Sequence, residues 1–238
     1  RADTEEVNAI TSGIDSWLTS EVPPHIRWDG LAWLSQSFSA ARLDQVRGPR
    51  FKELVNVLTS ALPEELDHLP IANAGLGQRR LLRQAVFARI EDPRIHDGVK
   101  RNSMLVRLEQ WRRSRRWTSG KGVPEGLPRG WEVADSFASV DTILFAQDES
   151  QSAEIDDLIT RWLRSTILGG RCWGAGCYGF SVVEGLQALV LNLACVGWLA
   201  RLHAAARGLH TIDLEAVTAS LGRIDRAAGR AKWLGSGA

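Results

Sequence analysis

The amino-acid sequence predicts an all-α protein, an irregular multi-helix bundle around a buried C-terminal apolar helix. Apolar residues recur at steps of three and four through most of the 238-residue chain, which is the period of an amphipathic helix. Short polar turns separate these segments, as in helical bundles. One segment, residues 181–207, is apolar around most of its circumference. A helix of that kind is expected to be buried on several sides.

Four amphipathic helices are expected in the first ninety residues. Their apolar stripes cover residues 7–18, 31–41, 51–62 and 81–90. Asp3, followed three positions later by Glu6, supplies a capping signal for the first of them. Breaks are expected at Pro23-Pro24, Gly48-Pro49, Pro63 and Asp92-Pro93.

A fifth helix is expected from Met104, with an apolar inner face and a basic outer face. The inner face is expected to comprise Met104, Leu105, Leu108 and Trp111, and the outer face Arg107, Arg112, Arg113, Arg115 and Arg116. Guanidinium groups pair with phosphate oxygens and aromatic rings stack on unpaired bases, so an RNA-binding adaptor is one hypothesis. A solvated helix face is the simpler interpretation. The pI of the chain is not strongly basic, which argues against a nucleic-acid partner.

The composition changes to glycine, proline and serine between residues 118 and 130, which indicates a linker. We expect an N-terminal helical region at residues 1–117, a linker and short packed segment at 118–149, and a C-terminal helical region at 150–238, together forming one compact domain. Residues 140–145 fit either a short helix or an extended piece. Asp213 is the expected cap of the last helix.

Cysteine usage gives no clear metal site. The chain has three cysteines, too few for a disulfide framework in a protein of this size. Cys172 and Cys177 lie in a glycine-rich loop, with His203 and His210 downstream, and thiolates and imidazoles together suit tetrahedral zinc. The spacing of the two histidines argues against a four-ligand site. Partly buried thiols in a tight packing loop are the preferred interpretation.

Glu184 lies at the start of the long apolar helix, where a carboxylate is favoured by the helix dipole. Structural capping is the simpler interpretation. The functional alternative is a polar pocket in which Glu184 faces Asp225, or Arg223, from the last helix. The sequence contains no nucleophile elbow, phosphate loop or dinucleotide fingerprint, so motifs alone do not indicate an enzyme.

The longest uncharged stretch, residues 185–200, falls short of the roughly 20 apolar residues needed to cross a bilayer. No membrane span is expected. Because no basic segment followed by a short apolar stretch opens the chain, we expect a cytoplasmic protein. The chain opens on Arg1 and not on Met, so we also allow for a natural start upstream.

A set of patterned segments between residues 156 and 229 carries a family resemblance. They are Ile159-Thr-Arg-Trp-Leu-Arg164 leading into Cys172, Tyr178-Gly-Phe-Ser-Val-Val-Glu-Gly185, Trp198-Leu-Ala-Arg201, Asp213-Leu-Glu-Ala-Val217 and Ile224-Asp225. In these segments the chain resembles the C-terminal helical region of the cysteine-cluster proteins of YkgJ type, the group that includes flagellin lysine N-methylase. Residues 47–54 and 81–90 look like the middle region of that family.

The resemblance implies a cytoplasmic metalloprotein that modifies or binds a protein partner, with methyl transfer to lysine from S-adenosylmethionine as the most specific activity. The family's closely spaced cysteines, thought to hold a metal or iron–sulfur cluster, are not found in this chain. Relatives also tend to carry histidines after the aspartate matching Asp225, where Arg226 and Ala227 stand here. We therefore expect no cofactor in this chain and no activity of the chain alone.

Two main hypotheses follow. In the first, the chain is the scaffold and one wall of a site completed by a separate cluster domain. Glu184 and Asp225 are then the catalytic candidates, Cys172 the cofactor-binding candidate, and Cys172 with Cys177 the weaker metal candidates. In the second, the chain is a non-catalytic helical interaction domain whose arginine-rich face or exposed apolar groove docks a protein partner.

Overall fold

The computed structural model describes residues 3–67, 74–90, 104–127, 130–146 and 148–227, without the side chains of residues 105–107. Among these residues the regular structure is helical, and the only strand-like pairings are two isolated bridges. The predicted all-α class, a bundle around a buried C-terminal apolar helix, is therefore confirmed. The expected break at Asp92-Pro93 lies outside the described residues.

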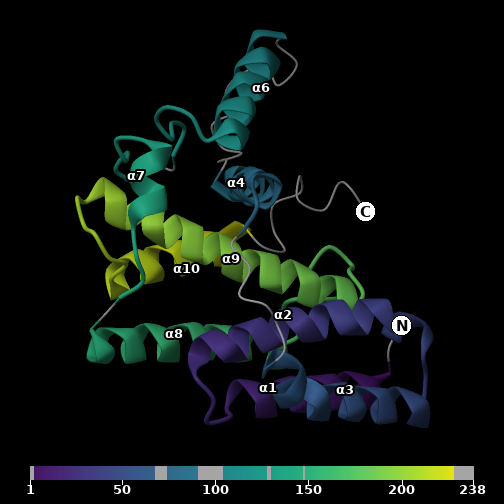
Figure 1. Ribbon diagram of the computed structural model, residues 1–238. Helices are drawn as coiled ribbons and strands as arrows, with labels where there is room; N and C mark the ends of the chain where they lie inside the picture. Colours follow the sequence, from purple (N-terminus) through teal and green to yellow (C-terminus); the bar gives the residue numbers. More distant parts are fainter. Residues whose placement is uncertain (1–2, 68–73, 91–103, 128–129, 147, 228–238) are drawn as a thin grey trace. The chain divides into compact units, whose positions relative to one another are not determined.

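The chain forms two compact units, each built from two separate stretches of sequence (Figure 1). Unit 1 comprises residues 1–72 and 156–190, and unit 2 comprises residues 73–155 and 191–238. The boundary falls inside two helices, α8 (Glu149–Leu168) and α9 (Val182–Ala206), each of which contributes residues to both units. The expected organisation into three sequential regions within one domain stays a prediction.

Unit 1 is built on three helices that pack against one another, α1 (Thr4–Leu18), α2 (Pro24–Ala40) and α3 (Pro49–Asp67), with a short 3-10 turn, η1 (Leu43–Gln45). The capping box predicted for α1 is present: Asp3 accepts from the first turn and the Glu6 carboxylate accepts from the Asp3 backbone N–H. The buried Glu6 also accepts a 2.9 Å hydrogen bond from the backbone N–H of Gly48.

The expected end of the third helix at Pro63 is wrong, because α3 continues through this proline to Asp67. Proline removes one backbone hydrogen bond within a helix. Leu62, immediately before it, is fully buried, and α3 packs along both α1 and α2. Tertiary packing of this turn therefore outweighs the local cost of the proline.

The interior of unit 1 depends on a close approach between α1 and α2. The Trp17 indole lies across Gly30, where a Cβ atom would fall 2.4 Å from Nε1. The same Nε1 donates a 2.9 Å hydrogen bond to the carbonyl oxygen of Arg27. Only glycine at position 30 leaves room for this indole, so the α1–α2 contact is fixed by one residue pair.

Unit 2 contains α4 (Leu76–Ile90), α6 (Met104–Ser119), α7 (Phe137–Thr142), α10 (Leu214–Ala227) and the second part of α9. Its interior holds an aromatic cluster with one ring from each of four helices: Phe87, Trp117, Phe137 and Trp198. Trp117 is at its centre, with ring centroids 5.7, 5.3 and 5.5 Å from Phe87, Phe137 and Trp198.

The segment at residues 140–145 combines both forms that its sequence allowed. Helix α7 ends at Thr142, and the chain then continues extended. Leu144 forms a parallel bridge with Thr211, in which its N–H donates to His210 and its carbonyl oxygen accepts from Ile212. The last helix begins as predicted, with the Asp213 carboxylate accepting from the N–H of Ala216.

Among the described helices, α9 is the one long and apolar enough to cross a membrane by length and composition. Half of its apolar window is buried inside the protein, as in the core helix of a soluble protein. No clear membrane span follows from it.

Candidate functional site

The glycine- and cysteine-rich loop before α9 is a compact turn within unit 1. The Gly174 N–H donates to the Phe180 carbonyl oxygen at 2.9 Å, and the Gly179 N–H donates to Gly174 at 2.8 Å. The loop then packs directly on α9: a Cβ atom at Gly185 would lie 2.1 Å from the Cys172 carbonyl oxygen. The predicted tight packing loop is confirmed.

Both loop cysteines are buried. Burial raises the pKa of the Cys172 thiol to about 12, so this thiol stays protonated near neutral pH. Its Sγ donates a weak hydrogen bond to the Thr166 carbonyl oxygen at 3.8 Å. No group of three or more histidine, cysteine or carboxylate side chains is positioned to hold a metal within the described part of the chain. The roles of Cys172 and Cys177 toward a cofactor or metal stay predictions.

Glu184 caps the long helix. Its carboxylate accepts a 2.7 Å hydrogen bond from the Ser181 N–H, and its own N–H donates to the Ser181 hydroxyl at 3.2 Å. This is the reciprocal capping box, so structural capping is confirmed. Glu184 belongs to unit 1, whereas Asp225 and Arg223 belong to unit 2. The pocket between them, and the catalytic roles of Glu184 and Asp225, stay predictions.

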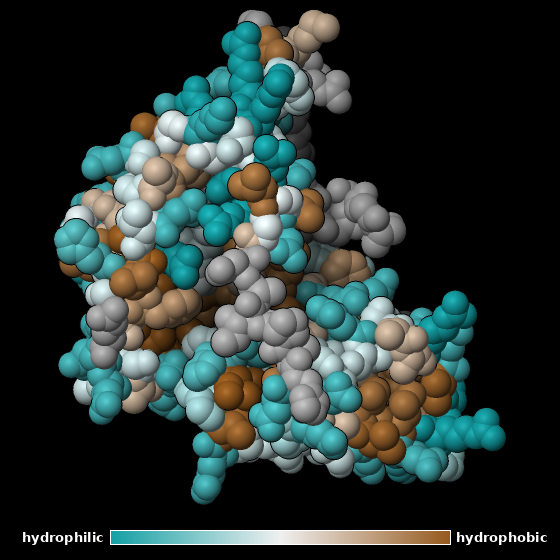
Figure 2. All heavy atoms as spheres, in the orientation of Figure 1, coloured by the Kyte–Doolittle hydropathy of each residue, from teal (hydrophilic) through white to brown (hydrophobic). Residues whose placement is uncertain are grey.

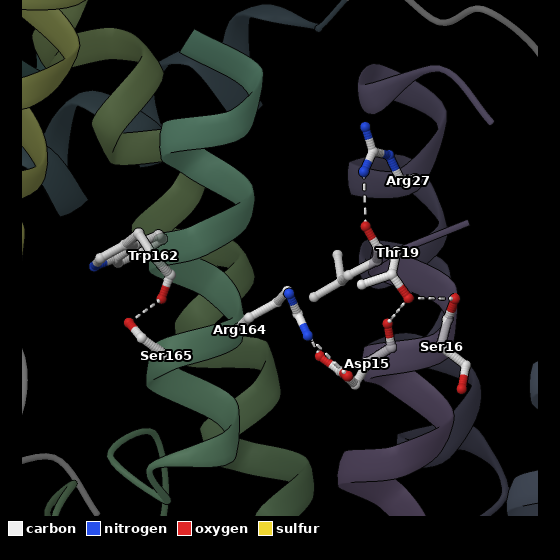
Figure 3. Close-up of polar contacts among 8 residues, drawn as sticks. Asp15, Ser16, Thr19, Arg27, Trp162, Arg164 and Ser165 are labelled. Atoms are coloured by element: carbon white, nitrogen blue, oxygen red, sulfur yellow. Dashed lines mark hydrogen bonds and ion pairs between the residues drawn. The ribbon is translucent and has the colours of Figure 1, made fainter. Parts of the chain in front are cut away.

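A charged pair joins α1 to α8 within unit 1 (Figure 3). Arg164 donates from Nε to Oδ1 of Asp15 at 2.6 Å and from Nη2 to Oδ2 at 3.2 Å. The hydrogen bond with Asp15 also raises the pKa of Arg164. Both carboxylate oxygens are occupied and the pair is partly exposed, so it fastens two helices and offers no free group for chemistry.

The surface of α6 carries the most distinctive exposed feature of unit 2. Met104, Leu108, Trp111 and Arg115 follow one another at steps of four, three and four, so they line one face of the helix. Met104 is 86% exposed, Leu108 42% and Trp111 55%. We call these four residues the α6 stripe.

The expectation that Met104, Leu108 and Trp111 form the inner face of this helix is wrong. Trp117 anchors α6 in the aromatic cluster, and at about 100° per residue it lies on the side opposite the α6 stripe. In Figure 1, α6 projects from α4 and α7. The stripe therefore faces away from the interior of unit 2. The side chains of Leu105 and Arg107 are not among those described.

Some arginines of α6 form ion pairs with described carboxylates, and others do not. Arg113 donates to Glu109 at 2.6 Å and Arg116 pairs with Glu125. The Arg115 guanidinium lies 5.3 Å from the centroid of the Trp111 ring, a cation–π contact. Among the described residues, no carboxylate lies within ion-pair distance of Arg112 or Arg115. The stripe is thus apolar along its first two turns and cationic at its end.

Fold and surface together define a helical protein of two units with an exposed apolar and basic helix face. No family model, curated protein or solved structure matches the chain.

Proposed function

We propose that this chain is a helical protein-binding module and that the α6 stripe is its docking face. The half-exposed indole of Trp111, held on the helix surface by the Arg115 guanidinium, is the observation that carries this proposal. Tryptophan, methionine and arginine are the residue types enriched at protein interfaces, and tryptophan and arginine dominate binding energy there.

The stripe also indicates the chemistry of the partner. Met104, Leu108 and Trp111 present apolar surface at helical spacing, which suits the apolar face of an amphipathic segment. Arg112 and Arg115, without carboxylate partners of their own among the described residues, favour acidic side chains beside that face. In Figure 2 the visible face of α6 is mostly teal, with a few brown and tan residues among the hydrophilic ones. The proposed partner is a protein with an acidic amphipathic helix.

Site-specific photo-cross-linking tests this proposal. A photoreactive residue in place of Leu108 is expected to yield one discrete adduct with a second protein in cells of the source organism, identified by mass spectrometry. The same residue in place of Leu168, which is 54% exposed on α8, serves as the matched control. Equal labelling from both positions would contradict a docking face on α6.

Binding of the identified partner then measures the contribution of the stripe. Trp111→Ala is expected to weaken binding about thirtyfold, the effect of losing a hot-spot side chain of about 2 kcal/mol. Leu108→Ser is expected to weaken binding as well, whereas Leu168→Ser leaves it unchanged. Because all three side chains are exposed, the melting temperatures of the variants should stay close to that of the parent protein.

The resemblance to the cysteine-cluster proteins supports a second proposal, in which the chain is the helical scaffold of a longer cytoplasmic metalloprotein, with protein-lysine methylation as its most specific activity. The rigid contact between Cys172 and Gly185 suits one wall of such a site. The iron–sulfur cluster or metal, and S-adenosylmethionine, would then be bound by the complete protein. Closely spaced cysteines upstream of Arg1 in the gene, and iron or zinc that copurifies with the complete protein but not with residues 1–238, are the expected results.

RNA binding through the arginines of α6 is the weaker alternative. Arg115 already covers the Trp111 ring, which leaves that ring less available for stacking on a base. Absence of binding to single-stranded RNA at low salt would exclude this function.

A further inference from the structure

Unit 2 contains a second group of charged residues, apart from the α6 stripe: Arg79, Arg83, Asp141 and Arg201. Arg79 and Arg83 are one turn apart on α4, Asp141 is on α7 and Arg201 is on α9. Arg83 faces Asp141, with Nη1 3.8 Å from Oδ2. After burial, which lowers the pKa of Arg201, the charges of Asp141 and Arg79 also shift this pKa, in opposite directions. The four formal charges sum to +2, so one carboxylate does not balance the group.

The charged residues of this group lie close in sequence to the rings of the aromatic cluster. Arg83 lies one turn before Phe87, Asp141 one turn after Phe137 and Arg201 about one turn after Trp198. The rings of Phe87, Phe137 and Trp198 all contact Trp117, so each of these charged residues lies about one turn from the same cluster. Helix packing thus brings Arg83 close to Asp141, although the two residues are far apart in the sequence.

Arg83 is buried and incompletely satisfied. Its side chain is 8% exposed, and its Nε has no hydrogen-bond partner among the residues that the structure describes. The 3.8 Å separation from Asp141 is longer than a hydrogen bond. A buried donor without an acceptor costs free energy, and a bound ion or water is one of the few explanations for it. The guanidinium is also held in place, since a Cβ atom at Gly120 would lie 2.5 Å from its Cζ.

Arg201 has no ion pair with a described carboxylate. Its guanidinium lies 5.3 Å from the centroid of the Phe145 ring, and among the described residues no carboxylate lies within ion-pair distance of it. Burial lowers the pKa of Arg201, Asp141 raises it, and Arg79 lowers it. Arg79 uses its Nε for the Ala74 carbonyl oxygen and has no carboxylate partner in the described part of the chain either.

We infer that Arg79, Arg83 and Arg201 form a binding site for a phosphate group beside Asp141. A doubly charged oxyanion would balance the net positive charge of these four residues. Planar guanidinium groups are the side chains best suited to phosphate oxygens. Phe145, half exposed next to Arg201, offers an apolar surface to whatever carries the phosphate. The ligand is a small phosphorylated molecule or inorganic phosphate, since both present the same group.

Calorimetric titration of the full chain with inorganic phosphate and with phenyl phosphate, at low ionic strength, tests this site. Both probes are expected to bind saturably at one site. Tighter binding of phenyl phosphate would support a phosphate monoester that uses Phe145, and equal affinities would support the phosphate group alone. Absence of saturable binding of either probe would overturn the inference.

Four variants locate the binding. Arg83→Gln and Arg201→Gln are each expected to weaken binding about tenfold or more, as the loss of a charge-assisted hydrogen bond would. Arg79→Gln, at an exposed position, reports on the site without disturbing the interior. Asp141→Asn is expected to tighten binding severalfold, because it removes the one negative charge beside the ligand. Weaker binding by Asp141→Asn would overturn the inference.

Arg226→Gln is the matched control, because Arg226 is an exposed arginine of α10 in the same unit. Its phosphate affinity is expected to stay within twofold of that of the parent protein. An equal loss in Arg226→Gln and Arg201→Gln would mean nonspecific attraction by the basic surface, which contradicts a defined site.

Discussion

The Nε of Arg89 donates a 2.7 Å hydrogen bond to Oδ1 of Asn192, and the two buried residues lie 103 positions apart in the chain. Nη1 of Arg89 also donates to the Ala85 carbonyl oxygen at 2.9 Å. Arg223 of α10 donates to the carbonyl oxygens of Arg89 and Ile90, which end α4. The last turn of α4 is thus joined to both α9 and α10, and the carbonyl groups of its last two residues are satisfied.

Replacing Asn192 should show how much this hydrogen bond contributes. Asn192→Leu leaves the Nε of the buried Arg89 without its acceptor, so the free energy of unfolding is expected to fall by about 3 kcal/mol in urea titrations. Gln187→Leu, at an exposed position of the same helix, should change it by less than about 0.5 kcal/mol. The double variant Arg89→Met/Asn192→Leu should recover part of the loss. Unchanged stability of Asn192→Leu would contradict the buried bond.

Two glycines of α9 are expected to respond in opposite directions to alanine. A Cβ atom at Gly185 would overlap the Cys172 carbonyl oxygen at 2.1 Å, and backbone cannot move aside cheaply. Gly185→Ala should therefore lower the free energy of unfolding by about 2 kcal/mol or more. At Gly197 no described residue lies within 4 Å of the added atom, so Gly197→Ala should raise the free energy of unfolding by about 0.5 to 1 kcal/mol. A thermal or urea unfolding series with both variants provides the measurement, and matching signs would refute the close contact.

The buried thiols should make the protein less stable at alkaline pH. Burial raises the pKa of Cys172 to about 12 and that of Cys195 to about 11. In the unfolded chain both thiols ionise above a pKa of about 8.5, so between there and the folded-state pKa the unfolded state binds fewer protons and stability falls. Each thiol should contribute a slope of about 1.4 kcal/mol per pH unit.

Urea unfolding between pH 8 and pH 10 measures this slope. Cys172→Ala/Cys195→Ala is expected to flatten it, whatever the variant's stability at pH 7. As an independent check, iodoacetamide should alkylate Cys172 slowly in the folded protein and rapidly in urea. An identical slope in the double variant would show that other groups cause the loss of stability at alkaline pH.

Apolar periodicity was sufficient to predict the helices, but not which face of each helix is buried. On α6, Met104, Leu108 and Trp111 form a regular apolar stripe, yet Trp117, on the other side, is the buried residue. Periodicity identifies a face and does not state what covers it. Similarly, Pro63 reads locally as a stop, and only the packing of α3 against α1 and α2 explains why the helix continues.

The candidate sites also differ in whether the sequence could predict them. The capping role of Glu184 depends on Ser181, three residues away, so sequence spacing could predict it. The proposed phosphate site combines Arg83, Asp141 and Arg201, which belong to three helices distant in sequence. The one local signal was the spacing of Arg79 and Arg83, which places both on one face of a helix but is common on solvated surfaces.

The position of Trp117 has a consequence for hydrogen exchange along α6. Its buried ring holds the last turns of the helix, while Met104, Leu108 and Trp111 leave the earlier turns in contact with solvent. Such a helix opens more easily where its side chains are exposed, so amide protons near Met104 should exchange with deuterium sooner than those near Trp117. A partner bound along the α6 stripe would slow amide exchange near Met104 first. The exchange rate there would therefore show whether a partner occupies the stripe.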